Sequence, residues 1–293
     1  MKSPIGCDCG DYVVLEKEVK GSDTAIVKYC QACDYAFLEN VNLPDNFYEI
    51  QYSHFLADRS GDDSWKNPEL HLKERQGEAK DRVNIIKQFI DFDNINSLLE
   101  LGSSSGFFLN QIKQSYPHIK LMGVEPEVKH RDYSNNQNIN TVDDIWMIDS
   151  KYELIISFFV LEHIHNPIDF ISELLKHLEA GGCLIFIVPN LNEALVKTYE
   201  NKNYDRFVWQ APHLSYFTEK ALQKLFSEFK GVLTTCQYQR YSISNHLNWL
   251  TDIKPERSFE YPHLQGEINN IYKEKLIENS IADTIVAKFK LDT

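Results

Sequence analysis

Four of the six cysteines lie in two close pairs near the N-terminus. One residue separates Cys7 from Cys9, and two residues separate Cys30 from Cys33. In a reducing compartment, thiolates on two facing turns can supply the tetrahedral sulfur shell that zinc prefers. The spacing therefore predicts one structural zinc ion bound by all four cysteines. The alternative is a set of unligated surface thiols.

A glycine-bearing turn follows the apolar stretch 97–101 and leads into a helical pattern. Gly102 and Gly106 would let the backbone approach a ligand at the carboxyl edge of a parallel sheet, where such folds bind cofactors. They are too few for the G-x-G-x-x-G turn of a dinucleotide site. Glu100 would repel a pyrophosphate, whereas it suits a cationic ligand. The turn therefore predicts a site for a cation-bearing cofactor.

Further polar residues occur where the next strands are expected to end. Glu125 follows the apolar stretch 121–124, and a carboxylate at a strand tip can accept both ribose hydroxyls of an adenosine. Asp143 or Asp144 could accept the adenine amino group, although either could instead cap a helix. Phe158 is expected to lie against the adenine ring. As a binding residue, Glu125 should contribute little to folding.

The elements that must position these residues alternate between strands and helices. An amphipathic helix is expected over 75–90, ahead of the first strand. The expected strands of the sheet are 97–101, 121–124, 154–158, 183–188 and 283–291. Such alternation builds a parallel sheet covered on both faces. The predicted fold class is therefore α/β, with a doubly wound, mostly parallel, seven-stranded Rossmann-like sheet and a small zinc ribbon.

The patterns divide the chain into three regions. Residues 1–40 are expected to form the ribbon, with short strands at 12–15 and 26–29. Residues 41–75 form an aromatic-rich connector or lid with short helices. The main domain follows as 76–293, in which 242–280 is expected to be an insertion that closes the acceptor site.

Composition narrows the classes of partner. Among 293 residues, 43 are acidic and 30 are basic, which gives a formal net charge of −13. This charge repels nucleic acid, and no local basic patch opposes it. The N-terminus lacks the apolar run of a signal peptide, and the apolar stretches are too short to span a bilayer. A cytoplasmic protein that acts on a small molecule is expected, and its oligomeric state is not predicted.

Several stretches, taken in order, resemble class I S-adenosylmethionine-dependent methyltransferases over about residues 80–293. They are ELGSSSGFFL at 100–109, VEP at 124–126, VLEHIHNP at 160–167 and LEAGGCLIFIVPN at 178–190. With the cysteine pairs and PHLSYFT at 212–218, the chain is similar to zinc-ribbon methyltransferases that act on nucleotide-linked sugars in bacteria. The resemblance implies S-adenosylmethionine as cofactor and a sugar or nucleotide sugar as acceptor.

The resemblance also implies the roles of individual residues. Glu100, Gly102 and Gly106 would cradle the methionyl part of the cofactor, Glu125 would bind the ribose, and Asp143 or Asp144 would bind the adenine. Ser103 and Pro126 are also expected to bind the cofactor.

Departures from that family's pattern favour one kind of transfer. Sugar C-methyltransferases of this type have tyrosine and glutamate before a catalytic histidine, whereas residues 209–212 here are Trp-Gln-Ala-Pro. They also have a longer C-terminal domain. The motif of adenine and glutamine N-methylation is replaced by Ser-Phe-Phe-Val at 157–160. O-methylation is therefore expected, and C-methylation of a nucleotide-linked keto sugar is the alternative.

Methyl transfer from a sulfonium to a hydroxyl requires alignment and removal of a proton. A histidine suits the second task. His213 follows Pro212 in a loop and is the first candidate for the base, and His163 is the second. Glu162 and His163 could also hold a divalent metal, but the sequence shows no third ligand.

Two other classes remain open from the sequence. A nicotinamide-dependent oxidoreductase would use the same sheet edge, although the glycine pattern and Glu100 argue against it. A non-catalytic protein could use the ribbon to recruit a partner.

Overall fold

The computed structural model describes residues 3–8, 10–251 and 260–292. They form two compact units. The first unit is drawn from 1–43, 161–170 and 186–287, and the second from 44–160, 171–185 and 288–293. A strand or helix that crosses one of these boundaries contributes residues to both units.

A seven-stranded sheet has the strand order β10-β11-β8-β7-β4-β5-β6. Its strands are β4 (Ser97–Leu101), β5 (Lys120–Val124), β6 (Thr141–Val142), β7 (Tyr152–Phe158), β8 (Leu178–Pro189), β10 (Gly231–Tyr238) and β11 (Thr284–Leu291). Strands β5 and β7 both pair in parallel with β4, and β6 pairs in parallel with β5. All five residues of β4 are buried, as a strand covered on both faces requires. The predicted α/β fold with a mostly parallel sheet is confirmed.

The register of the central strands brings their carboxyl ends to one edge. Leu101 at the end of β4 lies opposite Val124 at the end of β5 and opposite Ser157 near the end of β7. The residues that follow these strands, Gly102 and Glu125 among them, therefore emerge together. This is the edge at which the sequence places the cofactor.

Helices connect the strands. They include α3 (Gln76–Ile86), α4 (Phe107–Ser115), α5 (Val128–Asn136), α6 (Pro167–Lys176) and α9 (Glu219–Phe226). Helix α3 ends before Ile90, the predicted limit. The N–H groups of Gln88 and Phe89 donate three residues back, to Ile85 and Ile86, so the last turn tightens and the helix stops.

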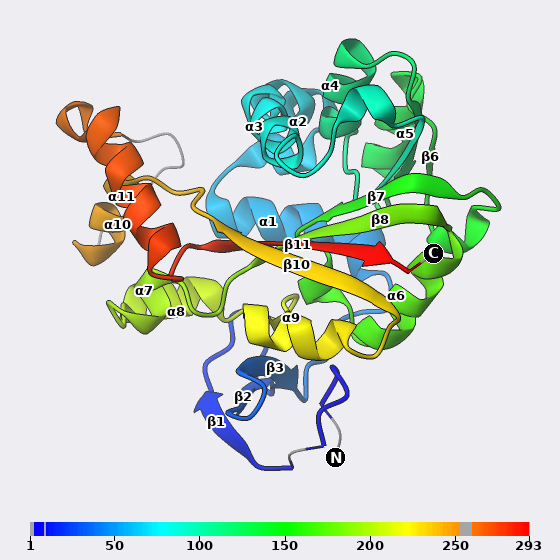
Figure 1. Ribbon diagram of the computed structural model, residues 1–293. Coiled ribbons are helices and arrows are strands. Elements are labelled where there is room, and N and C mark those ends of the chain that lie inside the picture. Colours follow the sequence, from blue (N-terminus) through cyan, green and yellow to red (C-terminus); the bar gives the residue numbers. More distant parts are fainter. Residues whose placement is uncertain (1–2, 9, 252–259, 293) are drawn as a thin grey trace. The chain divides into compact units, whose positions relative to one another are not determined.

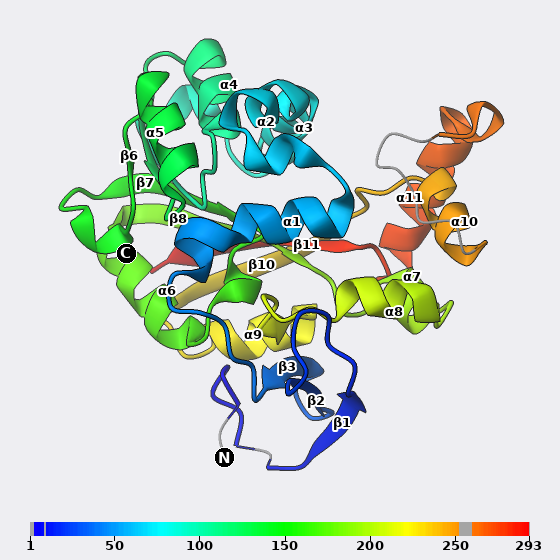
Figure 2. The same cartoon turned by 180° about the vertical axis from the view of Figure 1, so that it is seen from behind.

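The connector predicted at 41–75 contains short helices, as expected. They are a π-helical turn (Phe47–Gln51), α1 (Tyr52–Ser60), a 3₁₀ helix (Asp63–Lys66) and α2 (Pro68–Glu74). Asn67 starts α2, because its side chain accepts from the N–H groups of Glu69 and Leu70 while Pro68 occupies the first helical position. Figure 2 shows α1, α2 and α3 in succession.

A second, antiparallel sheet contains the N-terminal strands. Its order is β1-β2-β3-β9, formed by β1 (Tyr12–Glu16), β2 (Ile26–Cys30), β3 (Tyr35–Glu39) and β9 (Ser215–Tyr216). The two predicted ribbon strands are present. Strand β9 was not predicted, and it joins the ribbon from a distant part of the sequence. Val27 and Ala36 of the ribbon share an apolar cluster with Trp209 and Tyr216, so the ribbon is packed within the first unit.

The region 242–280 is helical where it is described. It contains α10 (Ile243–Leu250), a 3₁₀ helix (Pro262–Leu264) and α11 (Glu267–Glu278), close to α7 (Ala194–Lys197) and α8 (Lys202–Val208) in Figure 1. Tyr204 of α8 and Trp249 of α10 pack edge to face, with ring centroids 5.1 Å apart. Among the described residues, no helix has both the length and the apolar character needed to cross a bilayer.

Candidate functional site

The backbone of the glycine turn is fixed to the neighbouring strand. The N–H groups of Gly102 and Ser103 both donate to the carbonyl of Val124, at 2.8 and 2.9 Å. Gly102, Ser104 and Gly106 have φ values of 68°, 50° and 73°. Glycine adopts this left-handed conformation readily, whereas Ser104 adopts it at a cost.

Both glycines also leave no room for a side chain. A Cβ at Gly102 would lie 2.5 Å from Cγ2 of Val160, and one at Gly106 would lie 2.6 Å from Oγ of Ser134. Glycine is therefore required twice over at these positions, by conformation and by space.

Glu125 supports the turn from the end of β5. Its Oε2 accepts from the N–H of Ser104 at 2.7 Å, and its Oε1 accepts from the N–H of Glu127 at 2.8 Å. Burial raises the pKa of Glu125 to about 7, although these two hydrogen bonds oppose the rise. Two N–H groups, one buried and one half-buried, thus bond to its carboxylate, which argues against the expectation that Glu125 contributes little to folding.

Glu100 is fully buried near the end of β4. Neither of its carboxylate oxygens has a hydrogen-bond partner among the described residues. Burial raises the pKa of Glu100 to about 8, and Arg82, whose Nη1 lies 3.9 Å from Oε1, opposes the rise. A buried carboxyl group in this state gains stability from a cationic or hydrogen-bonding ligand.

Two more buried side chains near the same edge have no hydrogen-bond partner among the described residues. They are the hydroxyls of Ser103 in the turn and Ser157 near the end of β7. Native proteins rarely leave such groups unsatisfied without a reason. Together with Glu100, they fit a ligand that carries an ammonium group and hydroxyls, as S-adenosylmethionine does.

The remaining predicted cofactor residues have mixed surroundings. Asp143 and Asp144 are exposed, and Asp144 caps a 3₁₀ helix (Ile145–Met147) by accepting from the N–H of Trp146 at 3.1 Å. Asp144 therefore has the alternative role that the sequence allowed, that of a helix cap. The carbonyl of Pro126 accepts from Arg131.

Phe158 is buried between two other side chains. Its ring centroid lies 5.0 Å from that of Phe108, and the guanidinium of Arg82 lies 4.5 Å from its ring. Phe158 is thus part of the core, and its contact with adenine stays a prediction.

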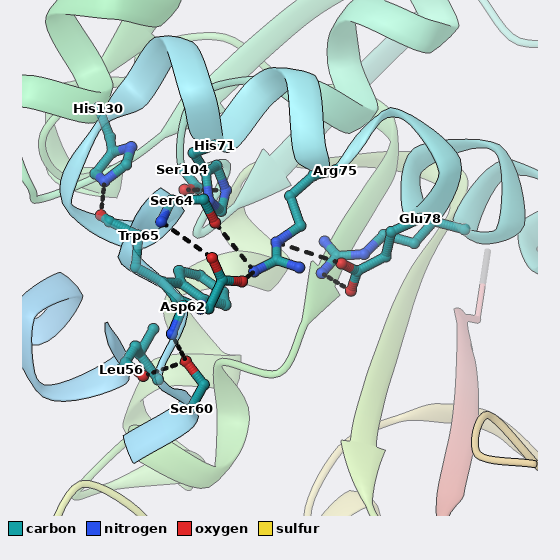
Figure 3. Close-up of polar contacts among 11 residues, drawn as sticks. Leu56, Ser60, Asp62, Ser64, Trp65, His71, Arg75, Glu78, Ser104 and His130 are labelled. Carbon is teal, nitrogen blue, oxygen red and sulfur yellow. Dashed lines mark hydrogen bonds and ion pairs between the residues drawn. The ribbon is translucent and has the colours of Figure 1, made fainter. Parts of the chain in front are cut away.

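The connector helices bind directly to the glycine turn (Figure 3). His71 of α2 is fully buried, and its Nε2 lies 3.2 Å from Oγ of Ser104. Burial lowers the pKa of His71 to about 2, so the ring is neutral. His130 of α5 forms a second link: its Nε2–H donates to the carbonyl of Trp65, which leaves Nδ1 to accept from the hydroxyl of Ser105 at 2.6 Å.

A buried arginine braces this region. Arg75 donates to the carboxylate of Asp62, which also accepts from the N–H of Ser64, and Nε of Arg75 lies 3.7 Å from Glu78 (Figure 3). Sequence reasoning missed this network, because its residues belong to no motif. The available signal was the spacing of His71, Arg75 and Glu78, which is that of one helical face, although the structure places His71 on α2 and Glu78 on α3.

The two candidate bases lie side by side in the first unit. His163 ends a 3₁₀ helix (Leu161–His163), and its ring centroid lies 4.9 Å from that of His213, at an angle of 80°. Nδ1 of His163 lies 2.7 Å from the carbonyl of Pro212. The amide nitrogen of Gln210 lies 2.8 Å from Nε2 of His213. The sequence indicated these two histidines as alternative candidates for the base, and the fold brings them together.

The cysteines also converge. Cys7, Cys30 and Cys33 are buried, and their Sγ atoms all lie within 4.8 Å of one another. Burial and the neighbouring sulfurs raise the pKa of Cys33. Cys9 lies outside the described residues. The alternative of surface thiols is wrong for the three described cysteines, and their sulfur donors fit zinc.

The chain was compared with known proteins. It matches the methyltransferase-domain family over residues 70–230. It is 22% identical over 224 residues to the malonyl-[acyl-carrier protein] O-methyltransferase of Paenibacillus sp. (strain JDR-2). The match covers 66% of this chain and 79% of that protein.

Solved structures share the fold. The plantazolicin methyltransferase BamL, in complex with a triazolic desmethylPZN analog and SAH, has a TM-score of 0.51 and 14% identity, covering 84% of this chain and 100% of that one. A possible histamine N-methyltransferase from Thermotoga maritima has a TM-score of 0.50 and 14% identity, covering 82% and 97%.

The mostly parallel sheet, with a glycine-bearing turn at its carboxyl edge, has the architecture in which α/β proteins bind cofactors. The chain belongs to the methyltransferase-domain family, and it is a class I S-adenosylmethionine-dependent methyltransferase. The oxidoreductase and the non-catalytic alternatives are thereby set aside.

Proposed function

We propose that this enzyme transfers the methyl group of S-adenosylmethionine to a hydroxyl of a small molecule, with a histidine as base. The observation that carries the proposal is the pairing of His163 and His213, because an imidazole is the side chain best suited to remove a proton from a hydroxyl at neutral pH. Bound S-adenosylmethionine supplies the electrophilic methyl group.

In this proposal, the residues of the glycine turn bind and orient the cofactor. The carboxylate of Glu100 and the hydroxyls of Ser103 and Ser157 would gain partners from the methionyl part. Glu125 would keep the turn in shape while it accepts from the ribose. Asp143 stays the better candidate for the adenine, since Asp144 already caps a helix.

His213 is the first candidate for the base and His163 is the second. A neutral imidazole accepts a proton only through the nitrogen that carries no hydrogen. In His163, Nδ1 faces the carbonyl of Pro212 at 2.7 Å and so carries the hydrogen, which leaves Nε2 as the basic atom. In His213, Gln210 fixes the ring by its contact with Nε2.

A sugar or nucleotide sugar is the acceptor that the sequence resemblance favours, and it stays part of the proposal. The malonyl-[acyl-carrier protein] O-methyltransferase suggests a different oxygen acceptor, a carboxylate. The two differ in their need for a base, because a carboxylate is already ionised at neutral pH. Removal of the base should abolish transfer to a hydroxyl and leave transfer to a carboxylate nearly unchanged.

A structural zinc ion at Cys7, Cys9, Cys30 and Cys33 completes the proposal. Four thiolates would close its coordination shell, so the ion would take no part in the reaction. Elemental analysis of protein purified without chelator should give one zinc per chain, and Cys30→Ser should reduce the content. Zinc-free protein with normal thermal stability would contradict this role.

The experiment for the whole proposal is methyl transfer from labelled S-adenosylmethionine to a panel of hydroxyl and carboxylate compounds, including nucleotide sugars. We expect a methyl ether as product. A methyl ester, or a product methylated on carbon or nitrogen, would contradict hydroxyl transfer.

A further inference from the structure

Three donor side chains of the first unit meet at one point. Glu162, His163 and His213 each place a ligand atom within 4.8 Å of the other two. Glu162 and His163 are buried, and His213 is half-buried. The sequence offered only the first two as metal ligands, and the fold supplies the third.

We propose that Glu162, His163 and His213 bind a divalent transition-metal ion. An ion with bonds of about 2.0–2.2 Å to nitrogen and oxygen holds its donors roughly 3–4 Å apart. The observed spacing therefore needs only small side-chain rotations to close around an ion. Two imidazoles with one carboxylate suit manganese, iron, cobalt or zinc and leave coordination positions for other ligands.

The surroundings of the cluster prepare His163 for this role. Its Nδ1–H donates to the carbonyl of Pro212, so the lone pair of the neutral ring lies on Nε2. Metal-binding histidines usually have such a partner on the second nitrogen, because it fixes the orientation of the ring. The carbonyl belongs to the residue before His213, so one backbone segment positions both rings.

Gln210 is placed to do the same for His213. Its side-chain nitrogen lies 2.8 Å from Nε2 and 3.2 Å from Nδ1 of that ring, and Gln210 is buried. An amide can present either its nitrogen or its oxygen after a half-turn. With the oxygen toward the ring, Gln210 would accept a ring N–H and leave the other nitrogen to the ion.

The catalytic consequence rests on the hydroxyl transfer of the proposed function and replaces its histidine base, whereas ion binding does not depend on that function. A divalent ion lowers the pKa of a coordinated hydroxyl and fixes its position. An acceptor hydroxyl bound to the ion would therefore lose its proton more readily. In that state His213 acts as a ligand, and the proton passes to another group or to water.

The direct test is binding of Mn²⁺, followed by its electron paramagnetic resonance signal. Manganese favours oxygen and nitrogen donors over thiolates, so it avoids the cysteine cluster. We expect one Mn²⁺ to bind per chain at millimolar concentration and Zn²⁺ to displace it. Glu162→Gln and His213→Ala should each weaken binding by at least about ten-fold.

His165→Ala is the matched control, because His165 is exposed and two residues from His163. It should bind Mn²⁺ as the wild type does. The proposal is overturned if the wild type binds no Mn²⁺, or if the ligand variants remain folded and bind it equally well. Circular dichroism of each variant shows whether it is folded.

Turnover then separates this proposal from the proposed function. Loss of activity on chelation, with recovery on adding Mn²⁺, supports the metal site and hydroxyl transfer, and it contradicts a histidine base. Activity that survives removal of this ion but not His213→Ala keeps the histidine base and overturns the catalytic role of the metal. Mn²⁺ binding without hydroxyl methylation would keep the metal site and contradict the proposed function.

Discussion

The glycine turn and the histidine cluster are assembled in different ways. The turn draws most of its groups from a short stretch, and its backbone is fixed by bonds to Val124 and Glu125. The cluster joins Glu162 and His163 to His213, about fifty residues away, through Pro212. In the proposed function, the turn would hold its backbone in shape for the cofactor, whereas the cluster would supply the reactive side chains.

His213→Ala should lower the turnover number by about 10²–10⁴-fold, the usual contribution of a positioned base. Cofactor affinity should stay nearly unchanged, because the residues of the glycine turn are intact. Steady-state kinetics and isothermal titration with S-adenosylmethionine measure the two quantities. His165→Ala serves as the control, and wild-type turnover in His213→Ala would shift the base to His163 or leave alignment alone.

Gly102→Ala should destabilise the protein more than Gly61→Ala does. Both glycines have positive φ, but a Cβ at Gly61 meets nothing within 4 Å, whereas one at Gly102 meets Val160 at 2.5 Å. The control should lose about 1 kcal/mol from conformation alone. Gly102→Ala should lose about 1–3 kcal/mol more from the clash. Denaturant unfolding measures both, and equal losses would mean that Val160 moves aside freely.

Glu125→Ala should weaken cofactor binding by about 1.5–3 kcal/mol. It should also destabilise the free protein by about 1–3 kcal/mol, because the N–H groups of Ser104 and Glu127 lose their acceptor. Titration calorimetry and thermal unfolding report the two effects. Glu127→Gln changes a neighbouring buried carboxylate and should alter stability without a comparable loss of affinity. If cofactor affinity in Glu125→Ala equals that of the wild type, Glu125 is purely structural.

Cofactor affinity should rise by about ten-fold as the pH increases from 6 to 8. The pKa of Glu100 is raised to about 8, so its carboxyl group is largely protonated at pH 6 and ionises over this range. The ionised form attracts the cationic cofactor. Titration calorimetry at several pH values measures the trend, and Glu100→Gln should flatten it.

The same shift has an opposite effect on the free protein. Because the pKa of Glu100 is higher in the folded state than in the unfolded state, its contribution to stability is fully present below about pH 4.5 and is lost as the pH rises through about 8. Stabilisation by bound cofactor should therefore grow with pH. A flat difference between the two melting curves would contradict the role of Glu100.

The sequence predicted those features that depend on local pattern. Apolar runs indicated the strands, and β4 begins and ends where expected, although Ser97 and Glu100 are polar residues within it. Glycine spacing located the turn, since only glycine combines positive φ with close packing at Gly102 and Gly106. The cysteine pairs likewise indicated a cluster before its geometry was known.

Only the tertiary structure decided which distant groups meet. Strand β9 completes the ribbon sheet, and His71 reaches Ser104 through helix α2, yet neither follows from spacing along the chain. The meeting of His213 with Glu162 and His163 likewise does not follow from spacing along the chain. Periodicity along the chain predicts a helix or strand from residues that are close in sequence. A polar contact between distant residues depends instead on how whole helices and strands pack. The sequence by itself therefore determined the fold class and the position of the glycine turn, and packing determined the partners of the buried polar groups.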